Sequence, residues 1–184
     1  MKTLYVAAVG SVASPVLNWI ENAAAEWFAF PIQRLPPLRV PEGAYDAGRG
    51  QYQSVDIMKA LAQGAPPDTA RLLGVTEVDL AIPMLSFLFG QAQLEGSVAL
   101  ISLCRLRQQF YGLPADEELL RERTVKETLH ELGHTFGLTH CPERKCVMSL
   151  ATHIGLVDQK AERYCARCGS HLAHRLAAAI GETL

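Results

Sequence analysis

The pattern of apolar and polar residues divides the first half of the chain into short strands and helices. Residues 3–9 form a continuous apolar run, which is typical of a strand that is covered on both faces. From Ser14 onward, apolar residues recur every three or four positions as far as Trp27, so we expect an amphipathic helix with Ser14 as its N-cap. Residues 32–40 contain two adjacent prolines and can form only an edge strand or a broken strand.

The same pattern continues through the middle of the chain. It predicts a helix at 51–63, a half-buried alternating strand at 78–82 and a strongly apolar strand at 98–103. Residues 87–92 are less uniform and contain Gly90, so we predict an exposed edge strand there. Strands that alternate with helices, followed by two strands close in sequence, indicate an α/β (α+β) fold with a mixed twisted sheet and an antiparallel edge strand.

Composition places the chain among globular proteins. Its 184 residues are 49% hydrophobic and 20% charged, which suits a substantial core, and we expect a single domain over residues 1–184. The net charge of −2 gives no electrostatic basis for binding nucleic acid or an anionic membrane, and the longest apolar runs are too short to span a bilayer. We expect a monomer that binds neither nucleic acid nor a membrane.

The N-terminus and the cysteines bear on the cellular compartment. Residues 1–9 resemble a short signal peptide, but the apolar stretch is at the short end of the usual range and is interrupted early by Gly10 and Pro15. We interpret it instead as the buried first strand. Five cysteines are an odd number, which argues weakly against a disulfide framework. The expected location is the cytoplasm.

A histidine motif in the second half of the chain carries the clearest chemistry. On a helix, His130 and His134 are one turn apart and point from one face toward the same place, at a spacing that suits zinc. Glu131 is the next residue round and can reach a water on the metal. Gly137 can adopt positive φ and end the helix, so that His140 approaches as a third ligand. Three protein ligands leave the fourth tetrahedral position open, as in catalytic zinc sites.

The surroundings of this motif support a rigid site. The helix is expected to begin near Thr124, because Thr124 and Glu127 have the spacing of a capping box. Its buried stripe would consist of Val125, Leu129, Leu132 and Phe136. Met148 follows His140 by eight residues, and this spacing predicts a tight turn beneath the metal, with the thioether as a hydrophobic base for the imidazoles.

Four cysteines close to this motif form a second candidate metal site. They are Cys141, Cys146, Cys165 and Cys168. Two pairs with short internal spacing are the usual framework of a closed structural zinc site. A rival set would combine the last two cysteines with His171 and His174, and a third possibility is four reduced thiols without metal. A zinc ion on four cysteines would tie the loop after His140 to the C-terminal helix.

The combined motif resembles a known family. The sequence H-E-x-x-H-x-x-G-x-x-H, followed by Met148, matches the metzincin pattern. The adjoining cysteine spacing, from Cys141 to Cys168, is similar to that of the archaemetzincins. This resemblance implies a compact metzincin fold, with a sheet-and-helix part over residues 1–140 and a smaller C-terminal part over 141–184 that holds the Met-turn and the four-cysteine site.

The resemblance also implies roles for individual residues and two zinc ions per chain. A catalytic zinc ion would be bound by His130, His134 and His140, with Glu131 as general base and acid. A structural zinc ion would be bound by Cys141, Cys146, Cys165 and Cys168. Met148 would form the Met-turn.

Two functions are compatible with these residues. The first is zinc-dependent hydrolysis of a peptide or protein substrate, which would pair with the predicted edge strand. The edge-strand residues that we expect to contact substrate are Phe87, Leu88, Phe89 and Gly90. The alternative is a zinc-stabilised, non-catalytic peptide- or protein-binding domain with an occluded site. The motif does not separate endopeptidase from aminopeptidase action.

Overall fold

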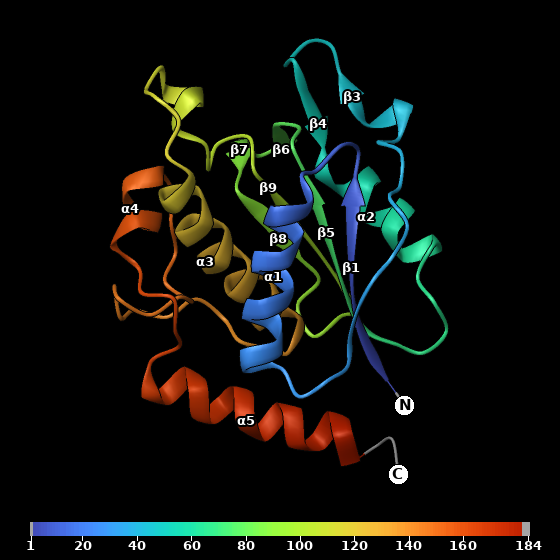
Figure 1. Ribbon diagram of the computed structural model, residues 1–184, viewed down its shortest axis with the longest axis vertical. Coiled ribbons are helices and arrows are strands. Elements are labelled where there is room, and N and C mark those ends of the chain that lie inside the picture. The colour runs from blue at the N-terminus through green and yellow to red at the C-terminus, as the bar shows by residue number, and fades with distance from the viewer. Residues whose placement is uncertain (1, 182–184) are drawn as a thin grey trace.

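Two β-sheets and five α-helices make up the described part of the chain, which is residues 2–181 apart from the side chain of residue 180 (Figure 1). The structure is a computed structural model. Residues 1 and 182–184 of the expected domain lie outside the described residues. The larger sheet has the order β2-β1-β5-β9-β8, and its strands are β1 (Thr3–Val9), β2 (Ile32–Arg34), β5 (Thr69–Thr76), β8 (Gly90–Ala92) and β9 (Val98–Ser102).

The larger sheet confirms the predicted mixed arrangement. The β2–β1, β1–β5 and β5–β9 pairs are parallel, whereas the edge strand β8 runs antiparallel to β9. The pattern of the sequence does not predict β5, although this strand lies in the middle of the sheet. Arg71 and Gly74 interrupt its apolar run. Close packing explains the glycine at position 74, because a Cβ there would lie 2.4 Å from Cδ1 of Leu61, which belongs to a helix that covers the sheet.

The smaller sheet has the order β3-β4-β6-β7, and its strands are β3 (Tyr45–Asp46), β4 (Gln51–Gln53), β6 (Leu80–Ile82) and β7 (Leu85–Leu88). The expected helix at 51–63 therefore starts later, as α2 (Ser54–Gln63). Two short 3₁₀ helices, η1 (Glu42–Ala44) and η2 (Gln108–Tyr111), complete the connections.

The predicted edge strand at 87–92 is divided between the two sheets, which corrects one expectation. Phe87 and Leu88 belong to β7 in the smaller sheet, and Gly90 begins β8 in the larger sheet. Phe89 lies between these strands and is buried in the main core. The chain passes from the smaller sheet to the larger sheet at Phe89, so residues 87–92 do not form one continuous strand.

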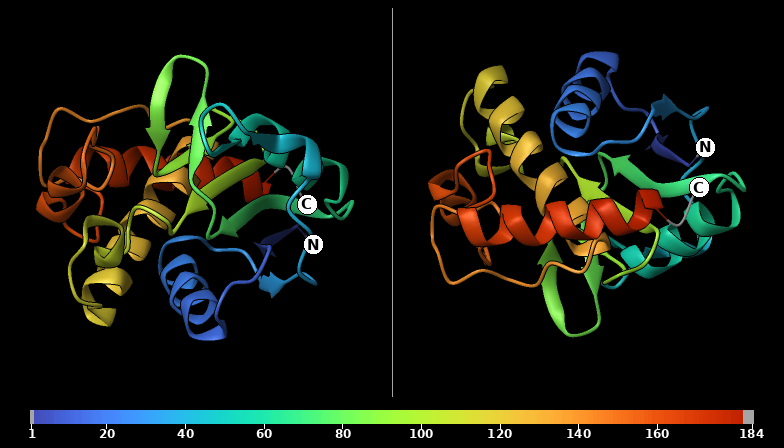
Figure 2. Two further views of the ribbon diagram at one scale, coloured as in Figure 1. Left: turned by 90° about the horizontal axis from the view of Figure 1, so that it is seen from above. Right: turned by 90° about the horizontal axis from the view of Figure 1, so that it is seen from below.

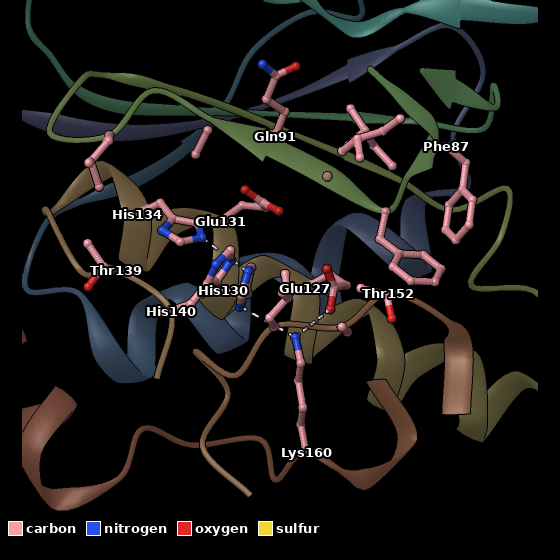
Figure 3. Close-up of a pocket in the computed structure, with 18 of the residues that line it drawn as sticks. Phe87, Gln91, Glu127, His130, Glu131, His134, Thr139, His140, Thr152 and Lys160 are labelled. Atoms are coloured by element: carbon pink, nitrogen blue, oxygen red, sulfur yellow. Dashed lines mark hydrogen bonds and ion pairs between the residues drawn. The ribbon is translucent and has the colours of Figure 1, made fainter. Parts of the chain in front are cut away.

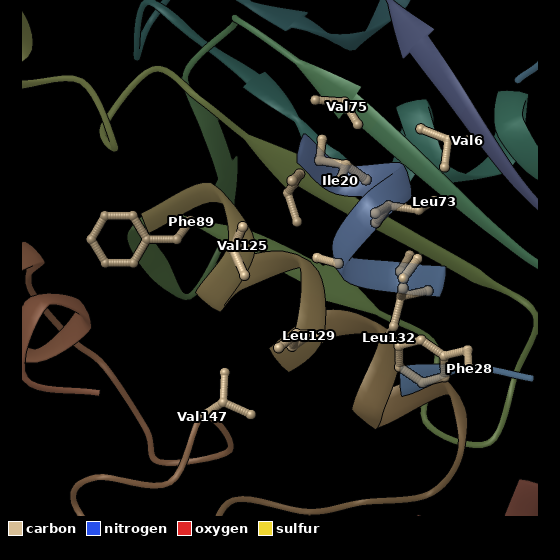
Figure 4. Close-up of a cluster of buried hydrophobic side chains, with 14 of the residues drawn as sticks. Val6, Ile20, Phe28, Leu73, Val75, Phe89, Val125, Leu129, Leu132 and Val147 are labelled. Carbon is tan, nitrogen blue, oxygen red and sulfur yellow. The ribbon is translucent and has the colours of Figure 1, made fainter. Parts of the chain in front are cut away.

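Helices cover both faces of the larger sheet (Figure 1). The core on one face combines residues of α1 (Ser14–Trp27) and α3 (Glu117–Thr135), and the core on the other face includes residues of α2. Alternate residues of β1 enter the two cores, as predicted for a strand that is covered on both sides. Figure 4 shows Leu129 and Leu132 of α3 in the cluster that also holds Leu73 and Ile20.

The two main helices begin differently from the expectation. Helix α1 starts at Ser14 itself, with Ala13 as an N-cap that makes no side-chain cap bond. Helix α3 begins well before Thr124, because Asp116 caps it by accepting a hydrogen bond from the Leu119 N–H at 2.9 Å. The capping-box spacing at Thr124 lies within a helix that is already formed.

The C-terminal part contains two helices, and the residues before and between them are mostly irregular. Helix α4 (Ile154–Gln159) is short, and helix α5 (Ala166–Gly181) passes beneath the C-terminal end of α3 (Figure 2). Arg175 of α5 donates a hydrogen bond from Nε to the carbonyl oxygen of Phe136 at 3.1 Å. Within the described residues, no helix has the length and apolarity that crossing a membrane requires.

Candidate active site

The structure brings the three motif histidines together (Figure 3). One ring nitrogen of each of His130, His134 and His140 lies within 4.8 Å of the others. Helix α3 presents the first two, and Gly137 then adopts φ +85°, as predicted, and ends the helix. The N–H of Leu138 donates to the carbonyl of residue 133 and that of Gly137 to His134, which is the Schellman pattern. This turn brings His140 back toward the helix.

Hydrogen bonds fix the orientation of two of the imidazoles. Nδ1 of His130 donates to the carbonyl oxygen of Val147 at 2.8 Å, and Nδ1 of His134 donates to that of Leu138 at 2.7 Å. Each Nε2 is therefore the unprotonated nitrogen, and the two Nε2 atoms lie 3.2 Å apart. Burial lowers the pKa of both imidazoles and favours their neutral form. Neutral imidazoles with converging lone pairs fit a divalent cation such as zinc.

Glu131 lies beside this nitrogen cluster, beneath the edge strand. It is buried, and burial raises the pKa of its carboxyl group well above the usual range, with a further contribution from the Glu127 carboxylate. Gly90 of β8 passes directly over it, since a Cβ at this glycine would lie 2.7 Å from both Cγ and Oε1 of Glu131. The strand can approach the carboxylate this closely only because Gly90 has no side chain.

A cleft of about 670 Å³ lies between β7, β8 and α3 (Figure 3). All four residues that were expected to contact substrate, 87–90, line it. The lining is mostly apolar on the strand side and along the rim, whereas the three histidines and Glu131 lie on the side of α3. The apolar lining consists of Leu85, Phe87, Leu88, Phe89, Ala92, Leu94, Leu150 and Ala151.

A buried ion pair beside the histidines was not predicted. Nζ of Lys160 lies 3.3 Å from Oε1 of Glu127 and 3.5 Å from Nδ1 of His130, and both charged residues line the cleft. Lys160 is 1% exposed and Glu127 3% at the side chain. Glu127 is one helical turn before Glu131, a spacing that indicates the same helix face. Lys160 lies in an irregular segment, and no local signal in the sequence indicates its partner.

Met148 packs against the active-site helix, and its expected role as a hydrophobic base for the imidazoles stays a prediction. Its side chain is fully buried, and Sδ lies 2.6 Å from where a Cβ of Gly133 would be. Gly133 is between the two helical histidines, so the thioether packs against the backbone that carries them. In the sequence, the only sign of this close approach is a glycine within a stretch that is otherwise helical in pattern.

The structure also brings the four cysteines together. One sulfur atom from each of Cys141, Cys146, Cys165 and Cys168 lies within 4.8 Å of the others. A hydrogen bond from the backbone N–H of Cys168 is the main factor that lowers the pKa of Cys165 to about 7, whereas burial raises the pKa of Cys146 and of Cys168. His171 and His174 of the rival set are exposed on α5 and do not join this cluster.

Comparison with known proteins agrees with these observations. A family model described as peptidase family M54 matches residues 32–174. Archaemetzincin from Methanocaldococcus jannaschii is 43% identical over 167 residues, which cover 91% of this chain and 90% of that protein. The crystal structure of archaemetzincin from Methanopyrus kandleri has a TM-score of 0.84 and 37% identity, with 96% of each chain covered.

A second solved structure carries a functional description. The crystal structure of a zinc-dependent peptidase from Methanocorpusculum labreanum has a TM-score of 0.79 and 28% identity, and the match covers 92% of this chain and 99% of that one. The resemblance inferred from the motifs and the expected metzincin-like fold are therefore confirmed.

Proposed function

This chain belongs to peptidase family M54 and is a zinc metallopeptidase, and we propose that it hydrolyses peptide bonds at the three-histidine site with Glu131 as general base and acid. The observation that carries this proposal is the position of the Glu131 carboxylate. It lies in the same cleft as three ring nitrogens that converge within 4.8 Å. A cleft that holds both groups can accept a peptide between them.

The residues of this chain would divide the chemistry as follows. A zinc ion bound by His130, His134 and His140 would polarise the scissile carbonyl and lower the pKa of a water molecule. Glu131 would accept a proton from the attacking water and then donate it to the nitrogen of the leaving amine. The carbonyl oxygens that accept from the two Nδ1 atoms would keep the imidazoles in the ligating tautomer.

The substrate would bind as an extended segment along β8. This strand is at the end of the larger sheet, and its partner β9 lies on one side only, so the edge that faces the cleft can pair with a peptide backbone. The segment 87–92 supplies one wall for substrate side chains. Its apolar lining suits apolar side chains on the substrate.

We also propose a second zinc ion on the four cysteines, which makes two per chain. Four thiolates occupy all tetrahedral positions, so this ion would have a structural role. The monomeric state, the cytoplasmic location, the lack of nucleic-acid binding and the organisation of 1–184 as one catalytic domain stay predictions; size measurement in solution and cell fractionation would test the first two.

Cleavage of a mixed peptide library, read by mass spectrometry, tests the proposed mechanism. The wild type is compared with Glu131→Gln and with Glu117→Gln, an exposed glutamate of the same helix that lies outside the cleft. All three proteins must first carry equal amounts of zinc. We expect cleavage by the wild type and by Glu117→Gln, and a loss of at least about 10²-fold in Glu131→Gln, because general acid–base catalysis contributes on that scale.

The cleavage positions would also distinguish the type of peptidase. Cuts inside peptides indicate an endopeptidase, and release of single N-terminal residues indicates an aminopeptidase. Wild-type activity in Glu131→Gln would remove this glutamate from the mechanism. Equal inactivity of zinc-loaded wild type and variant on the library would instead favour the zinc-stabilised binding domain.

A further inference from the structure

The four-cysteine cluster is joined to the histidine site by the chain itself. Cys141 directly follows His140, so the third histidine and the first cysteine share a peptide bond. Cys146 directly precedes Val147, whose carbonyl oxygen accepts the hydrogen bond from Nδ1 of His130. The positions of two cysteines therefore constrain the backbone at one histidine and the hydrogen-bond acceptor of another.

A third cysteine has a similar connection through a buried tyrosine. Cys165 directly follows Tyr164, whose hydroxyl group donates a hydrogen bond to the carbonyl oxygen of Leu129 at 2.6 Å. Leu129 precedes His130 in α3. The backbone N–H of Cys165 also donates to Sγ of Cys146 at 3.3 Å, so the two connections meet inside the cluster.

The fourth cysteine is connected to the remaining histidine through α5. Cys168 lies in the first turn of α5, and Arg175 follows two turns later. Arg175 forms an ion pair with Glu95, whose backbone N–H donates to the carbonyl oxygen of His134 at 3.1 Å. Figure 2 shows α5 passing beneath the end of α3, where these contacts are made.

Regular secondary structure does not hold this region in place. Residues 141–153 contain neither helix nor strand, although they include the acceptor for His130 and the methionine beneath the helix. A few backbone hydrogen bonds stabilise the segment, among them Val147 N–H to the carbonyl of Arg163 at 3.0 Å and Cys141 N–H to that of Met148 at 2.9 Å. A metal ion that draws the four sulfur atoms together would fix the first half of this segment, from Cys141 to Cys146, against the start of α5.

We propose that the four-cysteine cluster positions the three histidines, so that a metal ion held by the four thiolates raises the affinity of the histidine site for its own metal ion. The inference rests on the proposed metal binding at both sites and adds an energetic coupling between them. Such couplings are reciprocal and typically change affinity by about 5- to 150-fold.

Cobalt(II) is a suitable probe, because thiolate and imidazole ligands give distinct absorption spectra and each site can be titrated separately without measuring peptidase activity. Metal-free wild type and Cys168→Ser are titrated in parallel. We expect Cys168→Ser to weaken Co²⁺ binding at the histidines by at least about tenfold, within the usual range of such couplings. Cys104→Ser, which alters a half-buried cysteine outside the cluster, should leave that affinity unchanged.

A second control separates coupling from general loss of stability. Ile57 is fully buried in the core on the α2 face of the sheet, so Ile57→Ala destabilises the fold without touching the connections described above. At equal loss of melting temperature, Ile57→Ala should retain wild-type Co²⁺ affinity at the histidines. Equal weakening in both variants would overturn the proposal, because the effect would then follow from stability alone.

Tyr164→Phe provides a test in which all four cysteines are retained. This change removes only the hydroxyl group that bonds to Leu129, so the cluster should load normally while Co²⁺ binding at the histidines weakens measurably. Unchanged histidine-site affinity in both Tyr164→Phe and Cys168→Ser would overturn the coupling and leave the proposed peptidase function intact. If the coupling were present in a protein that cleaved no peptide, the coupling would stand and the proposed peptidase function would fail.

Discussion

At the scale of single residues, two glycines allow α3 and its neighbours to approach each other closely around the histidine site. Gly133 leaves room for the Met148 thioether against α3, and Gly90 leaves room for the Glu131 carboxylate beneath β8. In both places a single methyl group would occupy space that is already filled by another residue. The geometry of the site therefore depends on the lack of a side chain at these two glycines as well as on the residues that would bind metal or transfer protons.

Gly90→Ala should impair catalysis without removing a catalytic group. The new Cβ would lie 2.7 Å from Glu131 and 2.8 Å from the carbonyl oxygen of Leu100, and the backbone atom cannot move aside easily. We expect a loss of about 1–3 kcal/mol in the free energy of unfolding. We also expect at least about a tenfold decrease in kcat/KM, because a displaced Glu131 carboxylate would no longer be aligned to accept the proton of the attacking water. Zinc content should not change, since the histidines are not touched.

Gly43→Ala is the matched control for this substitution. A Cβ at Gly43 meets no atom within 4 Å, so stability and activity should stay close to those of the wild type. Peptide cleavage rates and urea denaturation of both variants give the comparison. If Gly90→Ala retained full activity, close packing of β8 over Glu131 would have no part in the reaction.

At the scale of elements, α3 connects the local sequence signals to the site. Asp116 fixes its start through a side-chain cap, and Gly137 fixes its end through positive φ. Between these positions the helix is buried on most sides, so tertiary packing rather than a capping box determines the conformation around Thr124. The Thr124 hydroxyl oxygen is buried and has no hydrogen-bond partner among the described residues.

Removal of the polar group should therefore lower the free energy of unfolding at Asp116 but not at Thr124. Asp116→Ala removes the cap of α3 and should cost about 0.5–2 kcal/mol in the free energy of unfolding. Thr124→Val replaces an unsatisfied hydroxyl group with a methyl group of similar shape and should leave stability unchanged within about 0.5 kcal/mol, or increase it. Urea denaturation measures both. A larger loss in Thr124→Val would mean that this hydroxyl has a role that the structure does not account for.

These elements also show which features could be predicted from sequence. The metal-binding pattern depends on helix periodicity and on one glycine, so the convergence of the three histidines was predictable from a few adjacent residues. The central strand β5 was not, because its conformation depends on pairing with β1 and β9, which lie far away in sequence. The Glu127–Lys160 pair joins residues that are 33 positions apart, with no local periodicity to connect them.

At the scale of the whole molecule, the two parts differ in their regular secondary structure. Both contribute to the main apolar core, to which the C-terminal part adds Val147, Met148 and Val157, but the part before residue 141 has both sheets, whereas residues 141–165 contain only the short helix α4. Arg144 and Lys145 lie exposed in the loop between Cys141 and Cys146. If metal ions fix this loop, their removal should loosen it well before the sheets unfold.

Limited trypsin digestion with and without a chelator tests this difference in stability. The Glu131→Gln protein is used, so that self-cleavage cannot contribute. We expect chelation to accelerate cleavage after Arg144 or Lys145 by at least about tenfold, because local opening then costs less free energy. Cleavage after Lys59, which is exposed on α2, should stay slow. Added zinc should restore protection, whereas equally early cleavage at both places would show that metal ions stabilise the whole fold uniformly.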